Sequence, residues 1–377
     1  MRIGFDSKRL YSNFTGLGNY SRTLVKNLQK FYSNDEYYLY TTKLKKTPET
    51  SFFYDSSNFN TYTAKTAFKS FWRSVSVVNQ LQKDKIDLYH GLSNEVPTNL
   101  KKTKIKSIVT IHDLIFKILP QTYPAIDRHI YDLKFRKSCQ SADRIIAISN
   151  STKKDLINFY NINPDKIDVI YQSCNPLFYE NSKNEDSEAI LKKHGIPNEF
   201  LLFVGSIEKR KNLKLLINAY QYLSPDLQIP LVIVGGNKSH KDELLEMIKA
   251  KKLEKKVLWI VDLKDNNHLK IIYKKAMALI YPSLYEGFGL PVAEALLSKT
   301  PVITSNVSSL PEAGGPNTLY IDPTNSEELA DAIKKVLTNS ELRKTMIHNG
   351  YEYAIQNLGP EVVSNKLMGC YTKTLQQ

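Results

Sequence analysis

The sequence predicts an α/β protein made of two Rossmann-like domains, each a doubly wound parallel sheet with helices on both faces. The chain has 377 residues, more than a single hydrophobic core usually supports. Short apolar segments of β type alternate with helical patterns along the chain, and this alternation is typical of parallel sheets. A polar, turn-rich stretch at residues 180–188 divides the segments into two series and indicates a linker or surface loop.

Each series contains six predicted strands, all short and mostly apolar. The first six are Arg2–Phe5, Tyr37–Thr41, Ile86–His90, Ser107–Ile111, Arg144–Ile148 and Lys166–Ile170. The second six are Phe200–Val204, Pro230–Val234, Val257–Val261, Ala278–Tyr281, Val302–Thr304 and Leu319–Ile321. Predicted helices between them include Ser151–Tyr160, Asn212–Leu223 and Ser326–Leu337. We therefore expect domains over residues 1–180 and 181–355, with ligands beyond the carboxyl ends of the strands and in a central cleft where the domains face each other.

Composition and charge narrow the class of protein. Hydrophobic residues make up 42% and charged residues 24%, as in ordinary globular proteins. No apolar run approaches the roughly 18 residues of a membrane helix, and the first residues lack the apolar core of a signal peptide. The three widely spaced cysteines, Cys139, Cys174 and Cys370, argue against a disulfide framework or zinc site and fit a reducing cytoplasm.

Positive charge is concentrated in the first half of the chain. Residues 1–180 hold 27 Lys and Arg against 16 Asp and Glu, whereas residues 181–377 hold 25 against 22. Such charge suits nucleic acid, an anionic membrane surface or phosphate-bearing ligands. We find no zinc-finger spacing or RNA-binding aromatic motif, so nucleic acid is the least favoured partner. The aromatic and basic run Phe68–Arg73 predicts either peripheral contact with the inner face of a membrane or a core-facing helix with snorkelling cations.

The motif with the most specific chemistry is YPSLYEGFGLPVAE, residues 281–294. It predicts a buried strand that turns into a helix through a loop in which Gly287 and Gly289 allow close approach of the backbone. Such a helix start presents N–H groups and a positive dipole to an anion. Glu286 and Glu294 on either side can accept hydrogen bonds from sugar hydroxyls. Phosphate and polyol together describe a nucleotide sugar, so the motif indicates a glycosyltransferase.

A second phosphate candidate precedes it, in the sequence LFVGSIEKRKN at residues 202–212. A strand, a glycine turn and a basic cluster come before a predicted helix. Arg210 could contact a diphosphate through two nitrogens, and Lys211 could contribute a point charge. The alternative is a solvated basic loop. No Asp-x-Asp pair occurs, so we expect neither a metal site nor a cofactor, and the charge on the diphosphate would be balanced by Arg, Lys and helix dipoles.

The first half carries polar residues after predicted strands. His112, in TIHDL, could donate to a sugar hydroxyl or stabilise developing charge, or be a structural histidine. Asp113 could cap the segment that follows. His90 and Asn94 could meet an acceptor sugar, or serve only turn chemistry.

The sequence TGLGNYS at residues 15–21 superficially resembles a dinucleotide-binding fingerprint. Ser21 stands where the third glycine would be, and the glycines come too late after the strand, so we exclude a nicotinamide site. We expect Gly16, Gly18 and Asn19 to form a flexible loop near the phosphate or the acceptor.

These residues together resemble the family-4 retaining glycosyltransferases, which have the GT-B fold. The resemblance covers nearly the whole chain and rests on five motifs. They are Glu286–Glu294, Gly205 with Arg210-Lys211-Asn212, His112-Asp113, the run 142–149 and Ser308–Glu312. It implies two Rossmann-like domains with the active site between them. It also implies that a helix at residues 356–377 returns to the N-terminal domain.

The resemblance also implies roles for individual residues. Lys211 and Arg210 would bind the donor diphosphate, Glu286 the transferred sugar and Glu294 the ribose, with His112 close to the reacting carbon. The turn residues that would lie around the donor are Gly205, Ser206, Gly287, Phe288, Gly289 and Leu290. Ser206 replaces the usual family arginine, and Arg210 would supply its charge.

The expected reaction is therefore transfer of a sugar, with retention, from a nucleotide diphosphate sugar to a hydroxyl of a saccharide or lipid-linked saccharide. GDP-mannose is the first choice of donor, because the motifs resemble those of mannosyltransferases in bacterial surface polysaccharide synthesis. Two alternatives stay open. A GT-B epimerase or phosphorylase would share the phosphate site, and a catalytically silent partner would bind the nucleotide sugar without turnover.

Overall fold

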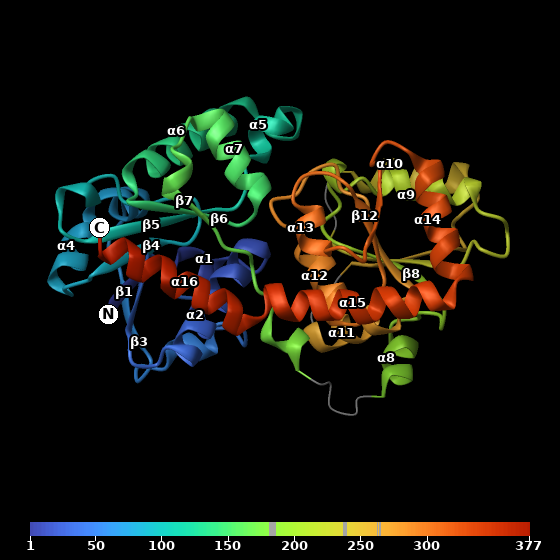
Figure 1. Ribbon diagram of the computed structural model, residues 1–377, viewed down its shortest axis with the longest axis horizontal. Helices are drawn as coiled ribbons and strands as arrows, with labels where there is room; N and C mark the ends of the chain where they lie inside the picture. The colour runs from blue at the N-terminus through green and yellow to red at the C-terminus, as the bar shows by residue number, and fades with distance from the viewer. Residues whose placement is uncertain (181–185, 237–239, 262, 264) are drawn as a thin grey trace. The chain divides into compact units, whose positions relative to one another are not determined.

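The computed structural model describes residues 1–180, 186–236, 240–261, 263 and 265–377. They form two compact units (Figure 1). Unit 1 contains Met1–Asn175 and Pro360–Gln377, and unit 2 contains Pro176–Gly359. Most of the linker predicted at residues 180–188 lies outside the described residues, because 181–185 are not among them.

Unit 1 is built on a seven-stranded sheet in which every neighbouring pair of strands is parallel. The strands are β1 (Arg2–Asp6), β2 (Glu36–Thr41), β3 (Phe59–Thr63), β4 (Leu88–Gly91), β5 (Lys106–Ile111), β6 (Arg144–Ala147) and β7 (Ile167–Val169). Their order is β3-β2-β1-β4-β5-β6-β7. The direction of the order reverses between β1 and β4, and this is where a doubly wound sheet offers a crevice.

The helices of unit 1 cover this sheet (Figure 1). They are α1 (Lys8–Ser12), α2 (Gly16–Phe31), α3 (Lys69–Phe71), α4 (Val77–Lys83), α5 (Ile115–Ile118), α6 (Ala125–Ser141), α7 (Asn150–Tyr160) and α16 (Pro360–Leu375). A π-helical turn, Trp72–Ser76, connects α3 to α4. Ser149 caps α7 by accepting from the N–H of Thr152 at 3.0 Å.

The helix α16 contributes to the core of unit 1 although it follows the whole of unit 2 in the sequence. Leu367, Met368 and Tyr371 are buried in the same cluster as Ile3 and Phe5 of β1. The unit is therefore assembled from two separate stretches of chain.

Unit 2 repeats the arrangement with six parallel strands in the order β10-β9-β8-β11-β12-β13. The strands are β8 (Leu201–Val204), β9 (Leu231–Val234), β10 (Val257–Ile260), β11 (Ala278–Tyr281), β12 (Val302–Ser305) and β13 (Leu319–Ile321). The helices are α8 (Ser187–Lys193), α9 (Leu213–Ala219), α10 (Lys241–Ala250), α11 (Asn266–Lys275), α12 (Leu290–Leu297), α13 (Leu310–Gly314), α14 (Ser326–Thr338) and α15 (Ser340–Leu358). The order reverses between β8 and β11.

Two local expectations were wrong. Strand β3 was not expected. It pairs with β2 at the edge of the sheet, and its sequence FNTYT is mostly polar and exposed, because an edge strand needs no continuous apolar run. Gly16 and Gly18 do not form a flexible loop but lie in the first turn of α2. A Cβ on Gly18 would stand 1.7 Å from the carbonyl oxygen of Asn13, so close backbone packing explains this glycine.

None of the helices in the described part of the chain combines the length and hydropathy that crossing a bilayer requires.

Candidate active site

The strongest candidate site lies in unit 2 at the reversal of strand order, in the loops that follow β8 and β11. Gly205 follows β8 with a φ of 151°, a conformation that favours glycine, and a helical turn over Lys209–Lys211 comes after it. The loop after β11 ends at Gly289, which lies immediately before α12 and has a φ of 111°. Adjacent parallel strands end at the same edge, so these two loops meet.

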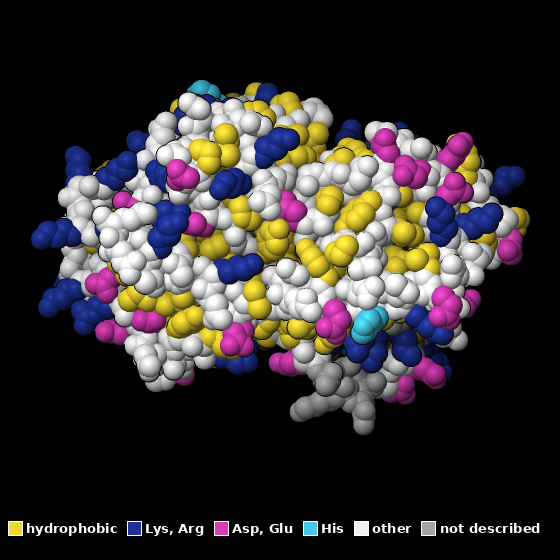
Figure 2. Space-filling model, in the orientation of Figure 1, with side chains coloured by type: hydrophobic (Ala, Val, Ile, Leu, Met, Phe, Trp, Pro, Cys, Tyr) yellow, Lys and Arg dark blue, Asp and Glu magenta, His cyan; other side chains and the backbone are white. Residues whose placement is uncertain are grey.

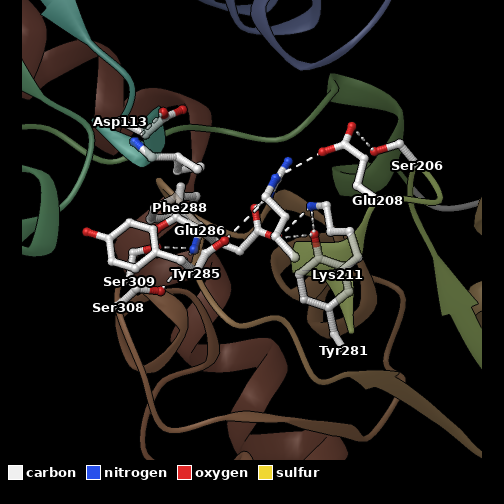
Figure 3. A network of polar contacts seen from close by, with 12 residues as sticks. Asp113, Ser206, Glu208, Lys211, Tyr281, Tyr285, Glu286, Phe288, Ser308 and Ser309 are labelled. Carbon is white, nitrogen blue, oxygen red and sulfur yellow. Dashed lines mark hydrogen bonds and ion pairs between the residues drawn. The ribbon is translucent and has the colours of Figure 1, made fainter. Parts of the chain in front are cut away.

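Glu286 is the centre of this site, and it is buried (Figure 3). Its Oε1 accepts from the ammonium of Lys211 at 2.5 Å and from the hydroxyl of Tyr281 at 3.1 Å. Its Oε2 accepts from Nη1 of Arg210 at 2.8 Å. Lys211 also donates to Tyr281. The cluster therefore brings together three residues that the sequence analysis assigned to donor binding, and it adds Tyr281.

The charge state of Glu286 follows from these neighbours. Burial alone would raise the pKa of its carboxyl group, but the cations of Lys211 and Arg210 outweigh burial and lower the pKa to about 2. Glu286 is consequently a carboxylate at every physiological pH, with hydrogen bonds to both of its oxygens. A group in this state serves as a fixed negative charge or hydrogen-bond acceptor and is a weak base.

Glu208 is the second carboxylate that binds Arg210. Its carboxylate accepts from Nε of Arg210 at 3.0 Å and from the hydroxyl of Ser206 at 2.9 Å (Figure 3). Ser206 and Arg210 were expected at the donor site, whereas Glu208, the acid that joins them, was not. The guanidinium thus lies between two carboxylates, which fixes its orientation.

Two serines after β12 support the loop that carries Glu286 (Figure 3). Ser308 accepts from the N–H of Glu286 at 3.0 Å. Ser309 donates to the carbonyl oxygens of Glu286 and Phe288, each at 2.8 Å. Asn212 fastens the other loop by donating to the carbonyl oxygens of Pro282 and Pro323. The backbone from Pro282 to Phe288 is therefore held by groups that follow β8 and β12, the two strands on either side of β11.

Glu294 lies on α12, one helical turn beyond its start, and is partly exposed. Its Oε2 accepts from the hydroxyl of Tyr273 at 3.0 Å. Burial raises the pKa of Glu294 to about 7, and the bond from Tyr273 only partly opposes this. Unlike Glu286, Glu294 changes its charge near neutral pH.

In unit 1, His112 is buried just after β5 with hydrogen bonds at both ring nitrogens. Its Nε2 is 2.9 Å from the carbonyl oxygen of Leu92, and its Nδ1 is 3.1 Å from the side-chain amide of Gln172. A carbonyl can only accept, so Nε2 carries the proton and Nδ1 accepts. Burial lowers the pKa of His112 to about 4. The ring is neutral, and donation to a sugar hydroxyl would require it to give up the bond to Leu92.

The remaining predicted residues of unit 1 have structural partners. His90 is fully buried, 2.6 Å from the hydroxyl of Tyr371 and 2.8 Å from that of Thr110, so it is a structural histidine rather than a group exposed to an acceptor. Asn94 has a positive φ of 64° and accepts from the N–H of His112 at 3.0 Å. Asp113 caps the next turn through the N–H of Ile115, as predicted.

The exposed Asn19 accepts from Arg22 at 2.6 Å, and Gly16 lies beside it in the first turn of α2.

Two partners were missed as site residues, because Tyr273 lies in α11 outside any motif and Glu208 lies inside the basic loop. Ser308 and Ser309 follow β12 and belong to a motif of the family resemblance. They reach the loop that carries Glu286 because β12 is the neighbour of β11. Within the described residues, no group of three or more His, Cys, Asp or Glu side chains is placed to hold a metal ion.

Two family models match the chain, one for each unit. The model described as "Glycosyl transferases group 1" matches residues 186–353, and the model described as "Glycosyltransferase Family 4" matches residues 14–176. The chain belongs to the family-4, group 1 glycosyltransferases. The cluster around Glu286 therefore lies in the group 1 portion of this glycosyltransferase, and His112 lies in the family-4 portion.

Two relatives agree with this family, and one solved structure shares the fold. The glycosyltransferase is 27% identical to O-antigen chain mannosyltransferase B of Escherichia coli, over 94% of this chain and 96% of the relative. It is 31% identical to O-antigen chain mannosyltransferase RfbU of Salmonella typhimurium, over 60% of each chain. A glycosyltransferase structure from Rickettsia africae superposes with a TM-score of 0.77 at 18% identity, covering 100% of this chain and 98% of that one. This last likeness supports the GT-B fold.

Proposed function

We propose that this glycosyltransferase moves a sugar from a nucleotide diphosphate sugar to a hydroxyl of a saccharide or lipid-linked saccharide, with retention at the anomeric carbon. The observation that carries the proposal is the buried cluster of Lys211, Arg210 and Glu286 at the reversal of strand order, next to the start of α12. Unit 2 would bind the donor and unit 1 the acceptor. GDP-mannose is the proposed donor, supported by the names of the two O-antigen relatives.

The cluster suits a diphosphate leaving group. As the bond to the sugar breaks, negative charge grows on the diphosphate, and Arg210, Lys211 and the first N–H groups of α12 would stabilise it. Glu286 would accept a hydrogen bond from a sugar hydroxyl and position the ring. The low pKa of Glu286 argues against a role as base. The departing diphosphate oxygen would instead accept the proton of the acceptor hydroxyl on the same face of the sugar, which accounts for retention.

The test is nucleotide release from a panel of UDP-, GDP- and ADP-sugars, run with EDTA, with the configuration of the product read by NMR. We expect release from GDP-mannose with retained configuration, and at least a tenfold loss in Glu294→Ala. Glu341→Ala removes a highly exposed carboxylate from α15 and serves as the matched control.

Turnover of another donor would overturn the choice of mannose, and an inverted product would overturn the mechanism. Nucleotide binding without turnover, with every acceptor class supplied, would identify a silent binding protein.

A further inference from the structure

Arg210 uses only part of its guanidinium group for contacts within the protein. Its Nη1 donates to the carbonyl oxygen of Tyr285 at 3.3 Å and to Oε2 of Glu286 at 2.8 Å, so both hydrogens of this nitrogen are engaged. Its Nε donates to Oε2 of Glu208 at 3.0 Å. Nη2 makes no hydrogen bond with any residue that the structure describes. The open nitrogen therefore adjoins the one that Glu208 occupies.

The same face of the guanidinium is the one that a phosphate needs. A phosphate binds an arginine most strongly through two neighbouring nitrogens. For Arg210 these are Nε and Nη2, because Nη1 is engaged by Tyr285 and Glu286. Glu208 holds Nε of this pair (Figure 3). A phosphate with two bonds to Arg210 must therefore take the place of Glu208 at Nε.

Of the two carboxylates that bind Arg210, Glu208 is the one that can leave. Glu286 also accepts from Lys211 and Tyr281, and its side chain is 8% exposed. Breaking the contacts of Glu286 would leave a buried charge poorly compensated. The side chain of Glu208 is 29% exposed, so water can replace Arg210 as its partner at a lower cost in free energy.

Glu208 also completes the charge balance of the site. The cluster is formally neutral, because its two cations face two carboxylates. The four groups are Arg210, Lys211, Glu208 and Glu286. Burial alone would lower the pKa of Arg210, but the carboxylates beside it raise this pKa, so the guanidinium keeps its charge. A diphosphate would enter a site without net positive charge, and the negative charge of Glu208 weakens its attraction to the cations.

We propose that Glu208 competes with the nucleotide diphosphate for Arg210 and thereby limits the affinity of the site. Glu208 leaves Nε of Arg210 when the diphosphate binds and returns when the nucleoside diphosphate departs, so the same carboxylate helps the product to dissociate. It is a positioning residue, because it acts on the nucleotide through Arg210 and through its charge. The competition rests on the proposed function, since it takes the cluster around Glu286 to be the donor site.

The test is isothermal titration of the full chain with UDP, GDP and ADP, followed by titration of Glu208→Gln with the tightest of them. The substitution removes the charge and keeps an oxygen that can accept from Ser206. We expect the dissociation constant of the nucleoside diphosphate to fall at least about tenfold. The matching nucleoside carries no phosphate, so its affinity, measured by competition, should not change. Thermal melts without ligand check that the variant is folded.

Glu254→Gln is the matched control, because it makes the same change in net charge at the far edge of the sheet. Glu254 is exposed and precedes β10, at the amino ends of the parallel strands whose carboxyl ends carry the site. Figure 2 shows acidic and basic side chains interspersed over the face of unit 2 that it presents, so the loss of one exposed carboxylate alters the field of this unit little. We expect no change in the affinity for the nucleoside diphosphate.

Lys211→Met separates the competition from the proposed function. Weaker binding of the diphosphate to Lys211→Met, together with unchanged or weaker binding to Glu208→Gln, would overturn the competition and leave the donor site in place. A gain for Glu208→Gln that is equal for the nucleoside and the diphosphate would also overturn it. Unchanged binding in both variants, or no binding of any nucleoside diphosphate to the wild type, would overturn the donor site and the competition together.

Discussion

Two glutamates at the candidate site have opposite electrostatic environments. Glu286 lies between two cations and stays ionised, whereas Glu294 accepts from the Tyr273 hydroxyl, has no cationic partner among the described residues, and has a pKa raised to about 7. The two carboxyl groups belong to one motif, and nothing in that motif distinguishes their charge states. Their neighbours make one a fixed charge and the other a group that titrates in the physiological range.

The first prediction concerns Lys211. Lys211→Met removes a buried cation and leaves Glu286 less well compensated, so we expect kcat/KM for the donor to fall at least about 100-fold and the melting temperature to fall. Lys209→Met is the matched control, because Lys209 is exposed two residues away. Steady-state kinetics and thermal melts measure both effects. Kinetics for Lys211→Met within about threefold of the wild type would remove Lys211 from the proposed site.

The second prediction concerns pH. A ribose diol bonds best to an ionised carboxylate, so donor affinity should rise as pH increases through about 7, where Glu294 loses its proton. The stability effect has the opposite sign. The folded chain holds this proton more tightly than the unfolded chain, so the stabilisation is lost as pH rises from 4.5 toward about 7.

Glu294→Gln should remove both dependences. Donor titrations and urea unfolding at a series of pH values would measure them, and a wild-type affinity that is flat between pH 6 and 8 would contradict the assignment.

At the scale of elements, helix α16 packs against strands that lie far from it in the sequence. Its Tyr371 lies 2.6 Å from Nδ1 of His90 on β4, and both groups are buried. Burial lowers the pKa of His90 to about 3, so the imidazole is neutral and needs hydrogen-bond partners on both nitrogens. Helix α16 therefore supplies a polar partner to the sheet as well as apolar surface.

We expect Tyr371→Phe to destabilise unit 1 by about 1–3 kcal/mol, because it leaves a buried nitrogen of His90 without its partner. Tyr32→Phe is the matched control, since it removes a hydroxyl that bonds to Asn365 at an exposed position and should change stability little. Urea unfolding measures both variants. An equal effect of the two substitutions would mean that the buried bond contributes no more to the free energy of unfolding than the exposed one.

The elements that the sequence predicted are those with a local signal. Buried strands such as β8 and β11 have continuous apolar runs, and the loop at 286–294 combines glycines with acids in one stretch. The edge strand β3 lacks such a run and was missed. The contact of His90 with Tyr371 joins residues 281 positions apart, and no local pattern of either segment encodes it.

At the scale of the whole molecule, the candidate donor site belongs entirely to unit 2. Its residues follow β8, β11 and β12, and all lie within Pro176–Gly359. We expect saturating GDP to slow hydrogen exchange of backbone amides in the loops at 205–212 and 286–294, and to leave the strands of unit 1 unchanged. Mass spectrometry of peptic fragments with and without nucleotide measures this. Protection of amides in unit 1, without protection of these two loops, would mean that the nucleotide binds in unit 1 instead.

The discontinuous assembly of unit 1 has a consequence for how the protein is made. The stretch that carries Tyr371 is translated only after all of unit 2, which takes roughly ten to forty seconds at about 5–20 residues per second. During that interval the sheet around β1 and β4 has emerged from the ribosome without the Tyr371 partner of His90 and with its apolar face uncovered by α16. The first unit to be synthesised is therefore the last to be completed, and the nascent chain offers a binding surface to chaperones while unit 2 is still being translated.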